Sequence, residues 1–293
     1  MPKTSTTDDF CAFILSHGRP NNIKTLDTLK RHGYRGKVYI VVDDGDKSLD
    51  EYKELHGDQV LVFNKLEVAK KFDRATNNDK MNTVIYARNA CFDLAREVGC
   101  RYFVQLDDDY TSFAFRFDQD LVYSYRQIKD LDQAFATVLE YYKSTPFASI
   151  AISQGGDWIG GSESPFAKTI TTKRKAMNSF FCDTEREFMF VGNINEDVNT
   201  YTYRQRQGLP FLTIFNIDLN QMQTQAQAGG MTDIYLDSGT YIKSFFSLLF
   251  APSCVTVGEI QSTASSVARL HHSVAWENTA PKIIRERHKK HWD

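Results

Sequence analysis

Three consecutive carboxylates, Asp107, Asp108 and Asp109, are the residues whose type and spacing point most clearly to chemistry. They directly follow a run of mainly apolar, strand-forming residues, Tyr102 to Leu106. Acids that end a buried strand of an open α/β sheet lie over the crevice where ligands bind. Because side chains two residues apart in an extended chain point the same way, Asp107 and Asp109 are predicted to share a face and Asp108 to turn away from them.

Two neighbouring carboxylates are hard to keep ionised unless a cation lies between them. The simplest such cation is a hard divalent ion, Mg²⁺ or Mn²⁺, which would bridge the protein to phosphate oxygens. The alternative is an acidic loop that faces water. The position of these acids at the end of an apolar strand favours the metal site.

The overall composition is that of a globular protein with no membrane partner. The chain has 293 residues, 42% of them hydrophobic and 25% charged, and its formal net charge is −2. Any polyanionic partner must therefore meet a local basic patch. Five scattered cysteines without metal-ligand spacing indicate free thiols in a reducing compartment. No run of about 18 apolar residues and no N-terminal targeting segment is present, so a cytoplasmic location is expected.

Up to residue 110, alternating strands and helices predict a mostly parallel α/β sheet with right-handed connections. The predicted strands are 10–15, 37–42, 59–63 and 102–106, and the predicted helices are 23–32, 48–55 and 84–98. Asn21 and Asn22 are expected to cap the first helix. The polar segment 64–82 is expected to be a long connection.

Beyond residue 110 the pattern is less regular. The predicted strands are 111–117, 149–153, 188–191, 211–217 and 250–257, and the predicted helices are 131–142, 198–207 and 237–249. The strand 149–153 leads into Gly155, Gly156, Asp157 and Trp158. Glycines around an acid and a tryptophan favour a backbone that approaches a ligand closely, and a plain loop between strands is an equally consistent interpretation.

Further acids and histidines stand at the ends of other predicted elements. They are Asp43 and Asp44 after the second strand, Glu196 and Asp197 at the start of a later helix, and His271 and His272 near the C-terminus. Because parallel strands end at the same edge of a sheet, Asp43 and Asp44 are expected beside the acids that follow residue 106 and beside the turn His17–Pro20.

Taken together, the motifs FILSHGRP, VVDDGD, LDDD and NED, a glycine-rich strand end and a late histidine resemble those of the GT-A glycosyltransferases. Within that superfamily, DDFCAFILSHGRPNN, ARNACFDLA, FVQLDDDY and HHSVAWEN are most similar to the TET-associated glycosyltransferases, phage enzymes encoded beside TET/JBP oxygenases. The resemblance covers about residues 10–275. A phage origin would place the protein in the host cytoplasm.

The resemblance implies one GT-A-like (nucleotide-diphospho-sugar transferase) domain over residues 1–293. Its fold would be α/β, with a mixed, mainly parallel central sheet flanked by helices. The nucleotide-binding half would span about 8–110 and the acceptor-binding and catalytic half about 111–275, followed by a basic tail, 276–293.

The implied activity is an inverting, metal-dependent transfer of a sugar from a UDP-sugar. Mn²⁺ or Mg²⁺ would be held by Asp109 with Asp107, and by His271 or His272, of which His271 is preferred. Asp197 is the expected base, with Glu196 beside it, and the alternative is that Asp197 only caps its helix. The residues expected to bind the nucleotide sugar are His17, Arg19, Asp43, Asp44, Arg88, Asp107 and Asp108.

The narrower resemblance implies that the acceptor is the hydroxymethyl group of 5-hydroxymethylcytosine in DNA. Acceptor contacts are expected from Gly155, Gly156, Asp157, Trp158, Lys173, Arg174 and Lys175, with Trp158 as a support for a flipped base. Further phosphate contacts are expected from Lys168, Lys282, Arg285, Arg287, Lys289 and Lys290, although charged residues in such runs often only face water. Other open interpretations are a saccharide or protein acceptor, and an inactive module that binds DNA or a sugar nucleotide.

Overall fold

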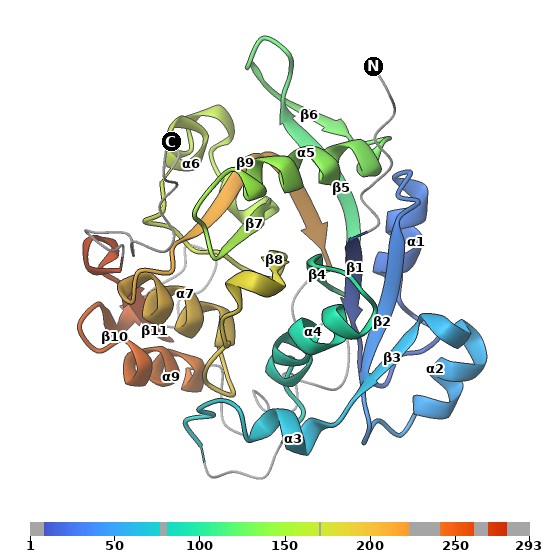
Figure 1. Cartoon of the computed structure of the whole chain (residues 1–293). Coiled ribbons are helices and arrows are strands. Elements are labelled where there is room, and N and C mark those ends of the chain that lie inside the picture. The colour runs from blue at the N-terminus through green and yellow to red at the C-terminus, as the bar shows by residue number, and fades with distance from the viewer. Residues whose placement is uncertain (1–8, 77–80, 170, 223–240, 261–268, 280–293) are drawn as a thin grey trace, which may run out of the picture.

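The computed structural model describes residues 9–76, 81–169, 171–222, 241–260 and 269–279 (Figure 1). A large central sheet carries helices on both faces. The strands of this sheet are β1 (Phe10–Leu15), β2 (Lys37–Asp43), β3 (Val60–Phe63), β4 (Tyr102–Asp107), β5 (Tyr110–Phe117), β6 (Tyr123–Gln127), β7 (Ser149–Gln154), β8 (Phe180–Asp183) and β9 (Phe211–Gln221). The helices are α1 (Lys24–Arg31), α2 (Leu49–His56), α3 (Lys65–Ala69), α4 (Ile85–Glu97), α5 (Leu131–Lys143), α6 (Pro165–Lys168), α7 (Glu196–Arg206) and α9 (Ile242–Phe250).

The strand order is β3-β2-β1-β4-β8-β7-β9-β5-β6, so strands from both predicted halves share one sheet. The first four of these strands are parallel, as their alternation with helices predicts. In the rest of the sheet only β7 and β9 pair in parallel, and β8 runs antiparallel to both β4 and β7. The sheet is therefore mixed, as predicted, and β5 and β8 are the strands that run against the direction of the others.

Alternation along β1 divides the core into two layers. Phe10, Ala12 and Ile14 face the layer under α1 and α5, whereas the residues between them face the layer under α4 and α7. Each layer is closed by the apolar side of its helices, so β1 is buried along its whole length. The polar ends of these strands are consequently held in fixed positions at the edge of a rigid sheet.

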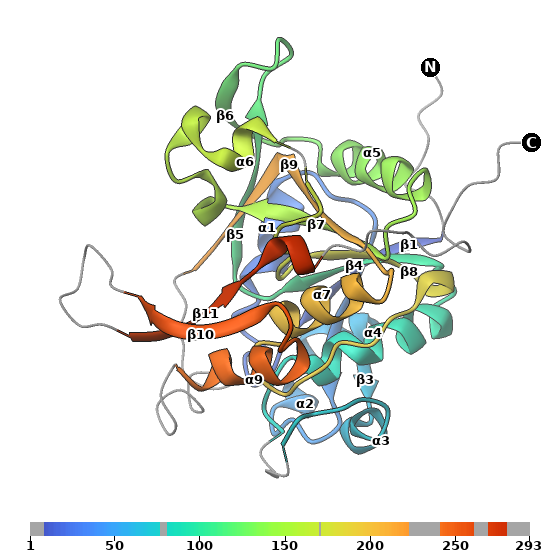
Figure 2. The ribbon, with the colours of Figure 1, turned by 90° about the vertical axis from the view of Figure 1, so that its left-hand side faces the viewer.

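A second, two-stranded sheet lies outside the central one. It consists of β10 (Val255–Ile260) and β11 (Arg269–Val274), and α9 packs against it and against α7 (Figure 2). None of the helices in the described ranges is long and apolar enough to span a bilayer.

Several predicted elements differ from the structure. Residues 188–191 form no strand, and the strand in this region is β8, whose partners could not be inferred from local pattern. The apolar run 250–257 is divided between the end of α9 and the start of β10. Asn21 and Asn22 do not cap α1, because Ile23 occupies the N-cap position without a side-chain bond. Segment 64–82 contains the short helix α3, and residues 237–240 of the predicted late helix lie outside the described residues.

Two glycines that end helices offer a test of backbone conformation. Gly33 follows α1 with φ +79°, and an added Cβ would lie 2.5 Å from the carbonyl oxygen of Lys129. Gly99 follows α4 with φ +70° but has open space around it. Gly99→Ala should lower the free energy of unfolding by about 1–2 kcal/mol, the cost of the left-handed conformation. Gly33→Ala should cost at least about 1 kcal/mol more, because a clash is added to that strain.

Urea unfolding of the two variants measures this difference. Equal losses for both would show that the loop around Lys129 moves aside without cost.

Candidate active site

The acidic stretch is the turn between β4 and β5. Strand β4 ends at Asp107, and Asp108 and Asp109 form the turn. The Asp108 carboxylate accepts a hydrogen bond from Ser16 Oγ (2.7 Å) and pairs with Arg19 Nη2 (3.1 Å). Asp107 instead pairs with Arg88. Asp107 and Asp108 thus turn to opposite sides, as the strand alternation predicts.

Arg88 is the group that joins the acidic turn to the second acidic motif. Its Nη2 lies 2.9 Å from Asp107 Oδ1 and its Nε lies 3.0 Å from Glu196 Oε1. The side chain is 1% exposed and its guanidinium lies near the rings of Phe180 and Phe190. The nucleotide contact expected of Arg88 stays a prediction, and in the free protein its donors go to Asp107, Glu196 and the carbonyl oxygen of Asn178.

Glu196 and Asp197 begin α7, as predicted from the NED motif. The Asp197 side chain is buried, and its Oδ1 accepts a hydrogen bond from the backbone N–H of Val198 (2.7 Å). The N-cap residue itself is Asn195, which has the left-handed φ of +61°. Asp197 therefore contacts the first turn of the helix without being its N-cap.

Burial dominates the acid–base behaviour of this region. Burial first, and then the Glu196 carboxylate, raise the pKa of Asp197 to about 7. Burial likewise raises the pKa of Asp107 to about 6, against the opposing effect of Arg88. Carboxylates with pKa values near neutrality are suited to accept a proton under physiological conditions.

Asp109 has the features of a cation ligand. Its Oδ1 atom is buried and has no hydrogen-bond partner among the described residues. Burial, and then the charge of Asp108, raise its pKa. A buried carboxylate oxygen without a partner, next to two further carboxylates, fits a hard divalent ion. Asp107 offers less, since one of its oxygens is held by Arg88.

The predicted histidine ligands lie on β11, in the outer sheet. His271 Nδ1 lies 2.7 Å from the carbonyl oxygen of His272, and the two rings are 4.3 Å apart. Burial, and then the charge of His271, lower the pKa of His272 to about 4, and its buried Nδ1 has no partner among the described residues. Within the described ranges, neither histidine forms a set of three close ligand atoms with Asp107 and Asp109.

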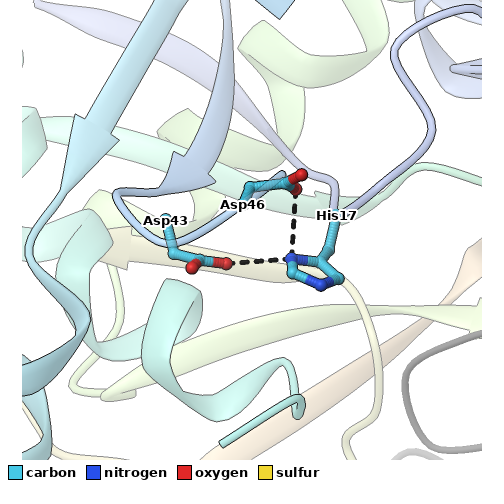
Figure 3. Close-up of side chains that lie close together, drawn as sticks. All are labelled: His17, Asp43 and Asp46. Atoms are coloured by element: carbon cyan, nitrogen blue, oxygen red, sulfur yellow. Dashed lines mark hydrogen bonds and ion pairs between the residues drawn. The ribbon is translucent and has the colours of Figure 1, made fainter. Parts of the chain in front are cut away.

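The one such set in the described ranges consists of His17, Asp43 and Asp46, at the ends of β1 and β2 (Figure 3). His17 Nδ1 lies 2.9 Å from Asp43 Oδ2 and 3.1 Å from Asp46 Oδ2. Lys65 Nζ lies 2.8 Å from the other Asp43 oxygen, so this cluster already contains its own cation and is not a metal site. Asp44 is exposed, and its Oδ1 accepts from the backbone N–H of Lys65 (3.0 Å).

The charged residues predicted to contact the acceptor form ion pairs within the protein. Gly155–Trp158 is a short 3-10 helix whose Asp157 pairs with Arg174 Nη2 (2.7 Å) and Lys175 Nζ (2.9 Å). Lys173 pairs with Glu277, and Lys168 with Glu163 (2.6 Å). The predicted tail contacts Lys282, Arg285, Arg287, Lys289 and Lys290 lie outside the described residues.

Trp158 does not offer a ring face to a ligand. It is 5% exposed, packs among Phe117, Tyr123 and Phe166, and donates from Nε1 to Ser153 Oγ (3.1 Å). Its predicted role as a support for a flipped base is therefore corrected to a role in the core. The close backbone approach predicted at Gly155 is to the protein itself, because an added Cβ would lie 2.9 Å from Asn220 Oδ1, whereas Gly156 is open.

Sequence reasoning missed three charged residues that hold these elements. Asp46 and Lys65 complete the His17 cluster, and the only local signal was the third acid of VVDDGD. Asp218, on β9, is fully buried and pairs with Arg116 Nη2 (2.7 Å). Burial raises the pKa of Asp218 to about 6. No spacing rule connects Arg116 and Asp218, since their strands β5 and β9 pair only in the folded sheet.

Replacing Arg88 tests its structural importance. Arg88→Met should lower the free energy of unfolding by about 3 kcal/mol, because the buried Glu196 and the partly buried Asp107 lose their counter-charge. The loss should shrink as the pH falls from 8 to 5, since Asp107, whose pKa burial raises to about 6, then takes up a proton and no longer needs its counter-charge. Arg96→Met is the matched control, because its ion pairs with Asp93 and Glu187 are exposed and are worth less than about 1 kcal/mol. If urea unfolding showed equal losses of free energy for the two substitutions, the ion pairs of Arg88 with Asp107 and Glu196 would not be the stabilising interaction described here.

Comparisons with known proteins were made for the whole chain. A search of the curated proteins gave no match. Among solved structures, the chain is similar to a mannosyltransferase from Pyrobaculum calidifontis in complex with GDP-Man and Mn²⁺, with 11% identity, a TM-score of 0.45, and coverage of 74% of this chain and 58% of that one. It is also similar to glucosyl-3-phosphoglycerate synthase from Mycobacterium tuberculosis in complex with Mg²⁺ and UDP, with 8% identity, a TM-score of 0.45, and coverage of 90% and 87%.

A third similar structure is S. aureus TarS 1-349 in complex with UDP-GlcNAc, with 9% identity, a TM-score of 0.43, and coverage of 83% of this chain and 67% of that one. The decisive comparison is with the protein families. The family model of the TET-associated glycosyltransferases matches residues 10–230 and confirms the resemblance seen in the motifs. The chain therefore belongs to the family of TET-associated glycosyltransferases.

Proposed function

We propose that this glycosyltransferase moves a sugar from a UDP-sugar to the hydroxymethyl group of 5-hydroxymethylcytosine in DNA, with inversion at the sugar carbon. The observation that carries the proposal is the bridge of Arg88 between Asp107 and Glu196. It holds the start of α7, and with it Asp197, next to the acidic turn. This proximity supports the proposal that Asp197 is the base and that the acidic turn binds the diphosphate.

Each residue of this site has a separate role in the proposed transfer. Asp197, with a pKa of about 7, accepts the proton of the acceptor hydroxyl. Glu196 keeps that pKa high through its charge and is itself oriented by Arg88. Asp109, with Asp107, would hold Mn²⁺ or Mg²⁺, which neutralises the charge that develops on the leaving diphosphate. The inversion follows from a base on the face of the sugar opposite the leaving group.

The DNA acceptor rests on membership of the TET-associated family and on a basic segment, Lys173 to Lys175. In the free protein these lysines and Arg174 are paired with Asp157 and Glu277. Phosphate contact by these residues would require the ion pairs to be exchanged, so their net contribution to binding is smaller than their number implies. A saccharide or protein acceptor is the second candidate, because its hydroxyl would need the same base.

Transfer can be tested directly by mass. Incubation with UDP-glucose or UDP-GlcNAc, Mn²⁺ and hydroxymethylated DNA should add the mass of one sugar residue per modified base, a hexose from the first donor and an N-acetylhexosamine from the second. Asp109→Asn should lower the rate at least about 100-fold, because transition-state charge then lacks its cation. Asp50→Asn, a change of an exposed acid at the start of α2, should leave the rate unchanged.

Unmodified DNA is the substrate control and should gain no mass. Release of UDP without any gain in DNA mass would favour a different acceptor. Absence of both UDP release and transfer with several sugar donors would contradict the proposed activity.

The pH dependence tests the assignment of the base. The rate should rise with pH through about 7, because Asp197 must lose its proton to act. Glu196→Gln removes the negative charge that raises the pKa of Asp197, so the rising limb should move to lower pH. Glu187→Gln is the control, since Glu187 is an exposed partner of Arg96 and should leave the limb in place. If the rising limb of the pH–rate profile stayed in place in Glu196→Gln, the assignment of Asp197 as the base would be contradicted.

A further inference from the structure

Trp276 is a partly exposed aromatic residue of the HHSVAWEN motif and has no role in the transfer as described so far. It begins the short 3-10 turn Trp276–Asn278, which lies just beyond β11. The backbone N–H of Ala275 donates to the carbonyl oxygen of Cys254 (2.7 Å), and the Thr279 hydroxyl donates to the carbonyl oxygen of Trp276 (2.9 Å). Hydrogen bonds on both sides therefore fix the backbone that carries the indole ring.

The ring of Trp276 stacks on that of Tyr201, a residue of α7. The two ring centroids are 5.7 Å apart, and the ring planes are inclined by 21°. Tyr201 is 3% exposed, so it supports the indole from the protein side, while the Trp276 side chain stays partly open to solvent. An aromatic ring that is held in place from behind and is still accessible is suited to bind a flat ligand by stacking.

Tyr201 also relates Trp276 to the proposed base. Asp197 and Tyr201 are four residues apart on α7, and this spacing places two side chains on the same face of a helix, about one turn apart. Burial, and then the charges of Asp197 and Asp157, raise the pKa of Tyr201, which agrees with this proximity. The indole ring therefore lies on the side of α7 that carries the carboxylate proposed to take the proton of the acceptor.

The charges next to Trp276 suit a phosphate backbone. Glu277, the following residue, pairs with Lys173 of the basic segment Lys173 to Lys175. This segment carries three positive charges, and its acidic partners in the structure are Glu277 and Asp157. The side chains of Lys173 and Glu277 are 42% and 79% exposed, so exchange of Glu277 for a phosphate oxygen costs little. A ligand that stacks on Trp276 thus meets cations that can bind phosphate.

We propose that Trp276 binds the extruded nucleobase of the DNA acceptor by stacking, with Tyr201 as the support behind it. This inference rests on the proposed function and names the residue that receives the base, a role that Trp158 cannot fill from the core. Chemistry on a base of duplex DNA requires that the base leave the helix stack, and a new stacking partner offsets part of the energy lost. Trp276 is in this role a binding residue, which holds the base near Asp197 and takes no part in proton transfer.

The kinetics of transfer test the stack. Trp276→Ala should raise the KM for hydroxymethylated DNA about tenfold, because the stacking of one base is lost. Trp276→Phe should stay within about threefold of the unmodified protein, since a smaller ring still stacks. The affinity for UDP in the presence of Mn²⁺ should be equal in all three proteins, because the substituted ring lies on the acceptor side of the proposed reaction.

Tryptophan fluorescence reports the same contact directly. An oligonucleotide that carries 5-hydroxymethylcytosine opposite an abasic site should quench the emission of the unmodified protein, and extrusion of this unpaired base costs least. The quenching should be lost in Trp276→Phe and kept in Trp158→Phe, whose substituted ring lies in the core.

Tyr141→Ala is the matched control. Tyr141 is a 45% exposed aromatic residue of α5, which covers the face of the sheet opposite to α7, so its loss should change neither the KM nor the quenching. Transfer to DNA with an unchanged KM in Trp276→Ala, or quenching that persists in Trp276→Phe, would overturn the stack and leave the proposed function standing. Absence of transfer to DNA by the unmodified protein would instead contradict the proposed function on which the stack depends.

Discussion

The buried ion triad of Arg88, Asp107 and Glu196 is the interaction on which the rest of the site depends. A guanidinium that is 1% exposed has lost its hydration, and the two carboxylates, the Asn178 carbonyl and the nearby rings of Phe180 and Phe190 compensate for that loss. The two acids depend on Arg88 in turn, because each would be costly to bury as an ion without it. The ends of β4 and α7, far apart in the sequence, are therefore fixed relative to each other by charge as well as by packing.

This arrangement explains why neighbouring acids behave differently. Asp107 is neutralised by the protein and is less available to a cation, whereas Asp109 has a buried oxygen without a protein partner. Asp108 is engaged by Ser16 and Arg19 and serves the loop after β1. Three identical side chains in sequence thus have three different environments, which are set by the elements that each one faces.

Local pattern was sufficient for the first half of the fold. The buried run 10–15 and the helical spacing of 84–98 match β1 and α4 closely, because burial on both faces and amphipathic period are properties of the segment itself. Strand direction beyond residue 110 could not be predicted in this way. The short strand β8, for example, is defined by its pairing with β4, a partner about 80 residues away.

The same distinction holds for the site. The acids Asp107 to Asp109 and Glu196–Asp197 were found because each follows or begins a recognisable element. Arg88 was singled out, but its contacts with Asp107 and Glu196 were not predicted, because sequence spacing does not show which charges meet inside a fold. The burial of Trp158 was missed for a related reason, since its neighbours come from β5, β6 and α6.

Strand β9 connects the Asp218–Arg116 ion pair with the acidic turn between β4 and β5. In its C-terminal third Asp218 pairs with Arg116, and just beyond its end the backbone N–H of Met222 donates to the carbonyl oxygen of Asp109 (3.2 Å). Its register with β7 shifts between Ile214 and Asp218, so one continuous segment passes from the pairing with β7 to the acidic turn. A displacement at one end of β9 is transmitted to the other end along its hydrogen-bonded backbone. Movement at the Asp218–Arg116 ion pair is in this way physically linked to the acidic turn that carries Asp109.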